Sequence, residues 1–192
     1  MKRIGLVGED PNDTASIKNL LAQKFGQQVF FKPLLKNIRG HQLDNNSTER
    51  SLKAELLNED FDTIIFIRDI DGLQSENLKV NKVAKWFAKL NAASGSIGVL
   101  LKNIYELEAL IFADIETFNN LYKTKIRDDR NIHFIKDPKE VLKEKTRKGK
   151  KQYKESDCPE LFKKLRYDVV KANSTMFSDF ENTFCMASRV RL

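Results

Sequence analysis

Two aspartates separated by one residue follow an apolar stretch, residues 63–68, in the sequence TIIFIRDIDG. Alternate residues of a β-strand point to the same side, so Asp69 and Asp71 would project together if the extended conformation continues to them. Two carboxylates held close together repel each other unless a proton or a cation lies between them. Mg²⁺ prefers oxygen ligands and is usually held by one or two carboxylates, water and phosphate oxygens. The pair therefore predicts a Mg²⁺ site, although Asp71 and Gly72 could instead simply form a turn.

A second acidic group follows the first apolar segment of the chain. Glu9, Asp10 and Asp13 come soon after residues 2–7, which have the pattern of a strand. Asp13, or Asn12 beside it, could cap the helix that the spacing of the next apolar residues predicts. Glu9 has no such structural explanation, so we expect it to act at the site.

The third acidic contribution comes from residues 105–122, whose apolar residues have helical spacing. On a helical wheel Glu108 lies at the flank of the apolar stripe, whereas Glu106 points further toward solvent. We therefore expect Glu108 to be a partly buried ligand, with a surface glutamate as the alternative. Asp114 lies near the middle of the apolar face, and we expect it to cap a helix that restarts at Ile115.

Alternating strands and helices must position these carboxylates. Apolar runs predict the strands, and helical periodicity predicts the helices between them. Buried strands separated by helices indicate an α/β fold, with a mostly parallel sheet sandwiched by helices. In such sheets ligands bind beyond the carboxyl ends of the strands, where the first two acidic groups lie. The expected strands are residues 2–7, 28–35, 63–68 and 96–101, and the expected helices begin at residue 14 and cover 50–57, 80–90, 105–122 and the carboxyl-terminal end, with a polar loop at 36–49.

Composition places the chain among ordinary globular proteins. Its 192 residues, 41% of them apolar, suffice for one globular unit with its own core. No apolar run approaches the roughly 20 residues of a membrane span, and the sequence MKRIGLVGED does not have the pattern of a secretory signal. Cys158 and Cys185 lack metal-ligand spacing and indicate unpaired thiols. We expect a cytoplasmic protein without a membrane partner.

Positive charge is concentrated in the carboxyl-terminal part of the chain. Residues 1–120 hold 15 Lys and Arg against 16 Asp and Glu, whereas residues 121–192 hold 19 against 11. The sequence KEKTRKGKKQYK, residues 143–154, contains seven basic residues and has the composition of a loop or a flexible arm. Such a surface attracts polyanions and contacts phosphates without reading bases, although it could also serve solubility alone. The nucleic-acid-binding residues that we expect are Arg147, Lys148, Lys150, Lys151 and Lys154.

Together these motifs resemble a Toprim domain, the fold shared by topoisomerases, DnaG-type primases and the overcoming-lysogenisation-defect nucleases. Glu9 and Asp13 match the Glu-x-x-x-Asp spacing of those nucleases, and Asp69 and Asp71 match their Asp-x-Asp. The sequence YELEALIFAD, residues 105–114, resembles a helix of small uncharacterised Toprim-like proteins that are often encoded beside ABC-type ATPases in prokaryotic defence loci. The resemblance therefore covers most of the chain.

This chain departs from that family at two positions. The family usually has Glu-Gly after the first strand where this chain has Gly8-Glu9, and it usually has Trp where this chain has Leu110. Within the Toprim interpretation, we expect residues 1–122 to form the catalytic core. Residues 123–192 would form a basic, mainly helical extension packed on that core in a single globular unit.

The resemblance implies a nuclease that hydrolyses phosphodiester bonds with Mg²⁺ or Mn²⁺, as the effector of an anti-phage defence system. Its implied partners are nucleic acid and an ABC-type or AAA ATPase encoded nearby. Glu9 would act as general base or second-metal ligand, and Lys139, with Lys154 as the other candidate, would stabilise charge in the transition state. The implied catalytic residues are Glu9, Asp69, Asp71, Glu108 and Lys139, and the implied metal ligands are Glu9, Asp13, Asp69, Asp71 and Glu108.

Three alternatives remain open from the sequence. The chain could be a Toprim-like subunit with little activity alone that a partner ATPase binds and regulates. The sequence IFIRDIDGL also resembles the first motif of haloacid-dehalogenase-type phosphatases, with Asp69 as nucleophile, Asp71 as acid, and Lys102 and residues 128–129 as later parts. A receiver-type phospho-acceptor would use Glu9 and Asp10 as the metal pair, Asp69 as the acceptor and Lys102 as the basic partner.

Overall fold

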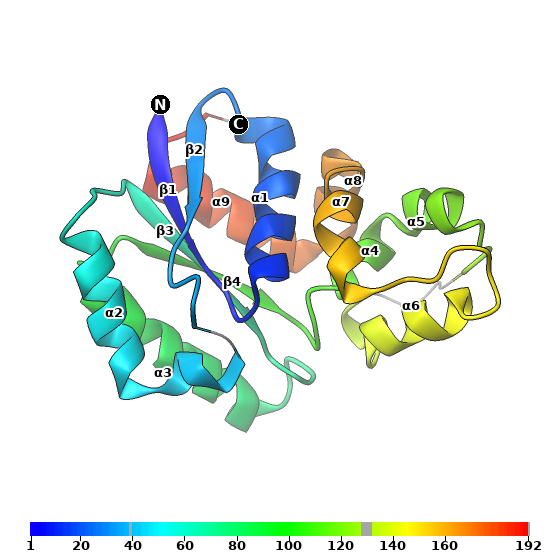
Figure 1. Ribbon diagram of the computed structural model, residues 1–192, viewed down its shortest axis with the longest axis horizontal. Coiled ribbons are helices and arrows are strands. Elements are labelled where there is room, and N and C mark those ends of the chain that lie inside the picture. Colours follow the sequence, from blue (N-terminus) through cyan, green and yellow to red (C-terminus); the bar gives the residue numbers. More distant parts are fainter. Residues whose placement is uncertain (39, 128–131, 192) are drawn as a thin grey trace.

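Four parallel strands form one sheet in the part of the chain that this computed structural model describes, residues 1–38, 40–127 and 132–191. The strand order is β2-β1-β3-β4 (Figure 1). The α/β fold class that the sequence predicts is confirmed, and all four strands lie within a few residues of their expected places. The strands are β1 (Lys2–Val7), β2 (Val29–Pro33), β3 (Thr63–Asp69) and β4 (Gly98–Asn103).

Helices connect the strands and make up most of the second half of the chain. None of the helices in the described ranges is long and apolar enough to cross a membrane. The α-helices are α1 (Pro11–Phe25), α2 (Asn46–Leu56), α3 (Asn77–Ala93), α4 (Ala109–Ala113), α5 (Ile115–Tyr122), α6 (Pro138–Thr146), α7 (Cys158–Phe162), α8 (Tyr167–Asn173) and α9 (Thr175–Ser188), and short 3₁₀ turns cover Gly40–Asp44, Ile132–Phe134 and Glu155–Asp157.

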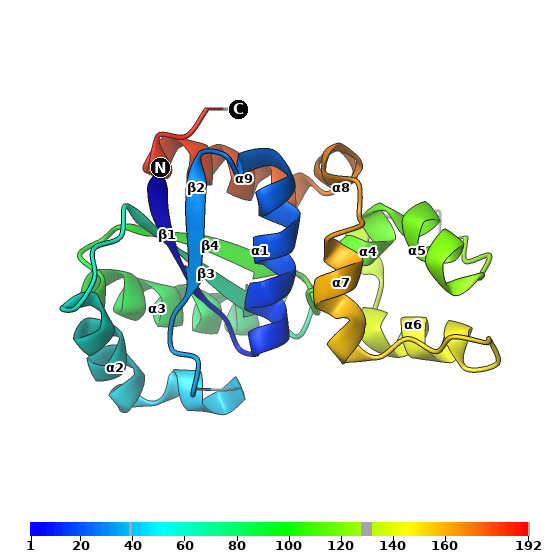
Figure 2. The same ribbon diagram turned by 45° about the horizontal axis from the view of Figure 1, so that its top comes forward.

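The sheet is covered on both faces, because its central strands are apolar at most positions. Ile65 and Ile67 of β3 belong to the apolar cluster that includes α1 and α9. Ile64 and Phe66 point to the other face, where α2 and α3 pack. The last helix therefore completes the covering of the sheet, next to β3 and β4 (Figures 1 and 2).

The order of the strands creates a switch point between β1 and β3. The chain passes from β1 outward to β2, and then returns to β3 on the other side of β1. Val7 at the end of β1 is in register with Phe66 of β3. The loops that follow these two strands therefore diverge from neighbouring points on the carboxyl edge of the sheet, which is where open α/β sheets bind ligands.

A small lobe built from α5, α6 and the segment after α6 lies beside this edge of the sheet (Figure 2). Its core is an aromatic group in which Phe118 and Tyr122 stack at 4.4 Å and Tyr153 packs edge-on against both rings. The backbone N–H of Tyr153 donates to Thr146 Oγ1 at 2.9 Å. Of the loop or flexible arm expected at residues 143–154, residues 143–146 instead belong to α6, whereas residues 147–154 contain no helix or strand and are fixed at their far end by the buried Tyr153.

Two other sequence expectations differ from the structure. The expected polar loop at 36–49 contains a 3₁₀ turn and the first residues of α2, because Leu43 and Thr48 are buried there. The expected helix 105–122 is divided into α4 and α5 at Asp114. Asp114 occupies the N-cap position of α5, as expected for a helix that restarts at this point, and Thr117 Oγ1 donates to its carboxylate at 2.8 Å.

Asp114 also anchors the carboxyl-terminal part of the chain. Its buried carboxylate accepts from the Arg166 backbone N–H at 2.8 Å and from the Arg166 guanidinium at 2.5 Å. Although burial acts to raise the pKa of Asp114, these hydrogen bonds outweigh it and hold the pKa below its ordinary value. Arg166 additionally pairs with the exposed Glu116 at 2.6 Å.

Replacing Asp114 by Ala should destabilise the protein by about 1–3 kcal/mol, because the donors of Arg166 and Thr117 lose their buried, charged acceptor. Glu116→Ala is the matched control, since it removes the exposed partner of the same arginine and should cost about 0–1 kcal/mol. Urea unfolding followed by circular dichroism measures both. Equal losses of stability in the two variants would contradict the anchoring role of Asp114.

Candidate active site

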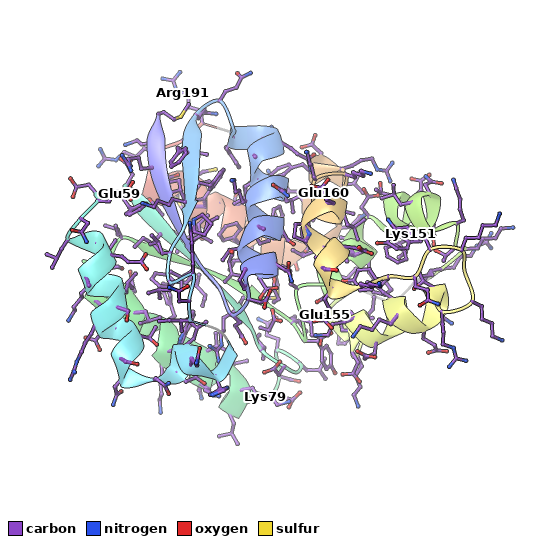
Figure 3. The ribbon with its side chains drawn as sticks, viewed as in Figure 1. Glu59, Lys79, Lys151, Glu155, Glu160 and Arg191 are labelled. Atoms are coloured by element: carbon purple, nitrogen blue, oxygen red, sulfur yellow. The ribbon has the colours of Figure 1, made fainter. Side chains whose placement is uncertain are left out.

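A cavity of about 270 Å³ lies at the switch point, where the carboxyl edge of the sheet meets α1, α6 and α7. The segments that line this cavity are far apart in the sequence. Figure 3 shows Glu155, one of its lining residues, between the sheet and the lobe. The cavity brings together all the acidic residues predicted for the site and the predicted lysine: Glu9, Asp13, Asp69, Asp71, Glu108 and Lys139.

Glu9 follows β1, and residues of the neighbouring strand β3 hold its side chain at the cavity. Its Oε1 pairs with Arg68 Nε at 2.9 Å and lies 3.4 Å from the Asp69 backbone N–H, which donates to it. Burial raises the pKa of Glu9, and the charges of Asp71 and Asp44 raise it further against the opposing effect of Arg68. Glu9 is therefore a more basic carboxylate than an exposed glutamate.

Asp13 points into the same cavity from the first turn of α1. The helix begins at Pro11, and Asp10 is its N-cap, so the expected cap at Asn12 or Asp13 is wrong. Asp10 accepts the Asn12 backbone N–H at 2.8 Å, and Asp13 reciprocally accepts the Asp10 backbone N–H at 3.2 Å, which makes a capping box. Burial raises the pKa of Asp13 to about 7, and the nearby charge of Glu108 adds to the effect.

Asp69 and Asp71 both line the cavity, but not for the reason that the sequence suggested. Strand β3 ends at Asp69, and Asp71 has a φ of 56°, so the extended conformation does not continue between them. Backbone bonds from Ile70 to the Asn103 carbonyl and from Asp71 to the Tyr105 carbonyl turn the chain instead. Aspartate tolerates this left-handed conformation better than most residues do.

A buried asparagine fixes the first of these aspartates. Asn103 is in register with Asp69 on the neighbouring strand and donates its side-chain N–H to Asp69 Oδ1 at 2.9 Å. Burial nevertheless raises the pKa of Asp69 well above its ordinary value, and the charges of Asp13, Glu9 and Glu108 raise it further. The four carboxylates thus interact electrostatically across one cavity.

Glu108 is the most deeply buried of the predicted glutamates, with 7% of its surface exposed. The hydroxyl of Tyr153 donates to its Oε1 at 3.2 Å and lies 2.9 Å from the Cys158 sulfur. Burial raises the pKa of Glu108, and Lys139 opposes the rise. Burial also raises the pKa of the Cys158 thiol, so this cysteine stays protonated beside the carboxylate.

Glu106 does not point away from the site as the helical wheel suggested. Residues 105–108 precede α4, so the wheel does not apply to them. The carboxylate of Glu106 lines the cavity, pairs with Lys139 Nζ at 3.2 Å and accepts the Lys139 backbone N–H at 3.1 Å. Glu155 lies further away, 3.9 Å from the same ammonium group.

The arrangement is a water-accessible cavity with many more carboxylates than cations. Repulsion between buried carboxylates favours the binding of a cation or of protons. Among the described residues, however, no three His, Cys, Asp or Glu side chains converge closely enough to hold a metal ion by themselves. Mg²⁺ usually takes only one or two carboxylates and completes its shell with water and phosphate. The donor chemistry therefore suits Mg²⁺, without a protein-only cage.

The remaining predicted residues lie elsewhere. Lys102 lines a different, small cavity beside Phe177, so it is separated from the acidic group, and residues 128–129 fall outside the described part of the chain. The basic residues after α6 do not line the acidic cavity; Lys151 lies over the Tyr122 ring at 4.3 Å on the lobe (Figure 3). The residues predicted to bind nucleic acid all lie outside the acidic cavity: Arg147, Lys148, Lys150, Lys151 and Lys154.

Sequence reasoning missed four residues that surround the carboxylates. Arg68 and Asn103 are polar residues at the ends of apolar strands, and their position at the same sheet edge was a usable signal. Tyr153 and Cys158 belong to segments that reach the site only through the packing of the lobe, so no local pattern indicated them. They reach Glu108 from 45 and 50 residues away in the sequence.

Comparison with known proteins gives no match. No protein-family model fits this chain, and neither the curated proteins nor the solved structures include a significantly similar one.

Replacing Asp13 by Asn tests the electrostatics of the cavity. Because the pKa of Asp13 is higher in the folded protein, the folded state binds more protons, and stability should fall as pH rises from about 4 to about 7. The amide of the Asp13→Asn variant cannot ionise but keeps an acceptor oxygen, so at pH 8 the variant should melt at least about 2 °C higher than the parent protein.

The comparison is made in metal-free buffer by thermal unfolding at pH 5 and pH 8. Asp60→Asn, which changes an aspartate outside the cavity, serves as the control. The difference in melting temperature between Asp13→Asn and the parent protein should shrink at pH 5, where Asp13 of the parent is protonated. A variant that is equally or less stable than the parent at pH 8 would contradict the repulsion described above.

Proposed function

We propose that this protein is a metal-dependent nuclease of Toprim type that hydrolyses phosphodiester bonds. One observation carries the proposal: carboxylates from three distant segments meet Lys139 in a single cavity at the switch point of a parallel sheet. A divalent cation in an acidic cavity suits chemistry on a phosphate ester, because the ion offsets the charge of both the carboxylates and the phosphate.

The bound ion would be Mg²⁺ or Mn²⁺, and it would polarise the phosphate and lower the pKa of an attacking water. Asp69, Asp71 and Glu108 are the residues that we assign to it. Because these side chains do not converge by themselves, one or two of them would bind the ion directly, and water and phosphate would complete its shell. Asp69 is already oriented by Asn103, and Glu108 by Tyr153. Such outer hydrogen bonds fix the direction of a ligand before the ion arrives.

Glu9 is assigned as the general base or as a ligand of a second ion, with Asp13 assisting it. Its raised pKa makes it a better proton acceptor than an ordinary glutamate, and its contact with Arg68 fixes one of its oxygens. Asp13, with a pKa of about 7, exchanges a proton in the physiological range.

Lys139 is assigned to stabilise negative charge on the phosphate. Burial acts to lower its pKa, but Glu106 and Glu108 reverse this and raise the pKa above its ordinary value. The ammonium group therefore stays charged, which suits electrostatic stabilisation and excludes a role as base. The exposed basic residues 147–154 would contact the backbone of the nucleic acid beyond the cavity.

A second candidate function is a regulated subunit with little activity alone. It is favoured by the finding that no three ligands converge among the described residues, so a partner would complete the site. We assign this partner to the ABC-type or AAA ATPases, and the role to anti-phage defence inside the cytoplasm. The phosphatase alternative is weaker, because Lys102 does not reach the acidic cavity.

Purified protein should nick plasmid DNA in the presence of Mg²⁺ or Mn²⁺, and a chelator should abolish the reaction. Asp69→Ala and Glu108→Ala should each lower the rate by about 10²-fold or more, since each removes a carboxylate assigned to the metal ion that stabilises charge on the phosphate. Glu116→Ala changes an exposed glutamate outside the cavity and should leave the rate unchanged. Agarose electrophoresis of supercoiled plasmid measures all four proteins.

Hydrolysis of a small phosphomonoester with intact plasmid would contradict the nuclease and support the phosphatase. Nicking that appears only after a partner ATPase is added would support the regulated subunit. Structured and single-stranded RNA are included beside DNA, because nothing in the cavity distinguishes the sugars.

A further inference from the structure

A second cavity, of about 220 Å³, adjoins the acidic one. The two cavities share Asp69 and Asp71 as a common wall. The opposite side of the second cavity is formed by the end of β3 and by α3, and it carries Arg68, Lys79 and Lys82. A carboxylate-rich cavity therefore borders directly on one with several cationic side chains.

Arg68 is the central feature of the second cavity. Only 8% of the residue is exposed, and its guanidinium lies 5.0 Å from the centre of the Trp86 ring. Its Nε pairs with Glu9 at 2.9 Å and its Nη2 with Asp44 at 3.0 Å. Its Nη1 is buried and has no hydrogen-bond partner among the described residues. An unpaired buried donor of this kind is costly, and a bound acceptor would satisfy it.

Two lysines of α3 add to this charge at the rim. Lys79 Nζ donates to the Asp71 carbonyl at 2.6 Å and pairs with Glu76 at 2.9 Å, and Figure 3 shows this lysine near the start of α3. Lys82 Nζ pairs with Asp44 at 3.1 Å, and 68% of its side chain is exposed. Both ammonium groups can therefore reach a ligand in the cavity without unfolding any element.

The charge balance of the second cavity depends on the first. Its three cationic side chains face the carboxylates of Asp44, Asp69 and Asp71, and Arg68 and Lys79 are also paired with Glu9 and Glu76. When Asp69 and Asp71 hold a divalent cation on their other side, their charge is offset, and the three remaining carboxylates only balance the three cations. An anion bound by the unpaired Nη1 of Arg68 then meets no net negative charge in the second cavity.

The size of the cavity limits what this anion is. Drug-sized ligands occupy about 300–1,000 Å³, so a cavity of 220 Å³ suits a small group and not a whole nucleotide. The Trp86 ring is 8% exposed and one face is covered by Arg68, so it offers no surface for base stacking. A guanidinium with two ammonium groups is the donor set that proteins use for phosphate.

We propose that Arg68, Lys79 and Lys82 form a phosphate subsite that binds a backbone phosphate of a nucleic-acid strand, next to the phosphate held in the acidic cavity. This inference rests on the proposed function for the identity of the polymer. The subsite sets the direction of the strand, because it fixes a second phosphate along the line from the acidic cavity toward α3. The subsite contacts a backbone phosphate, so it does not distinguish one base from another.

The test measures binding and not cleavage. Affinity for a fluorescein-labelled single-stranded oligonucleotide is measured by anisotropy over a range of salt, with Glu108→Ala present in every protein so that the strand stays intact. Lys79→Ala/Lys82→Ala should weaken binding about tenfold. The slope of log K against log salt should become shallower by about 0.7, as expected when one phosphate contact is lost from a single strand.

Lys85→Ala/Lys89→Ala is the matched control, because it removes two exposed lysines from the same helix outside the cavity. It should change neither quantity. Equal effects of the two pairs would overturn the subsite, since they would show only the loss of general charge. Inorganic phosphate that binds as tightly as the oligonucleotide would overturn the assignment to a strand.

The outcome is separable from that of the nuclease assay. A wild-type protein that fails to nick plasmid, but whose lysine pair shows the specific loss of affinity, would refute hydrolysis and keep the phosphate subsite. Normal nicking with identical effects of the two lysine pairs would keep hydrolysis and refute the subsite.

Discussion

The carboxylates gathered at the carboxyl edge of the sheet repel one another, and the surrounding structure has to hold them in place. Glu9, Asp13, Asp69 and Glu108 raise one another's pKa or have it raised by burial, and few cations are present to offset them. The fold tolerates the arrangement because each carboxylate has its own fixed partner. These partners offset part of the repulsion that burial and crowding create among the carboxylates.

The partners come from every layer of the molecule. Arg68 holds Glu9 from the neighbouring strand, and Asn103 holds Asp69 from the strand beyond it. Tyr153 reaches Glu108 from the lobe. Lys139, at the start of α6, is itself held by Glu106. The parallel sheet thus sets the positions of the carboxylates, while the packing around it restrains their directions.

The sequence predicted the layers and the acidic residues, and it failed where contacts are long-range. Apolar runs identified the strands because a sheet covered on both faces needs apolar residues at consecutive positions. The wheel placed Glu106 wrongly because a helix was assumed where the chain is irregular. The prediction of a loop or flexible arm at residues 143–154 missed the end of α6 and the packing of Tyr153 against Phe118 and Tyr122, which no local pattern reveals.

Tyr153 gives the basic segment a second property. This residue lies between Lys151 and Lys154, which face outward, yet its own hydroxyl donates to a carboxylate inside the molecule. The exposed part of the segment is therefore connected to Glu108 through one side chain. Because the Tyr153 ring also packs against Phe118 and Tyr122, a displacement of the outer surface would alter the surroundings of the inner carboxylate.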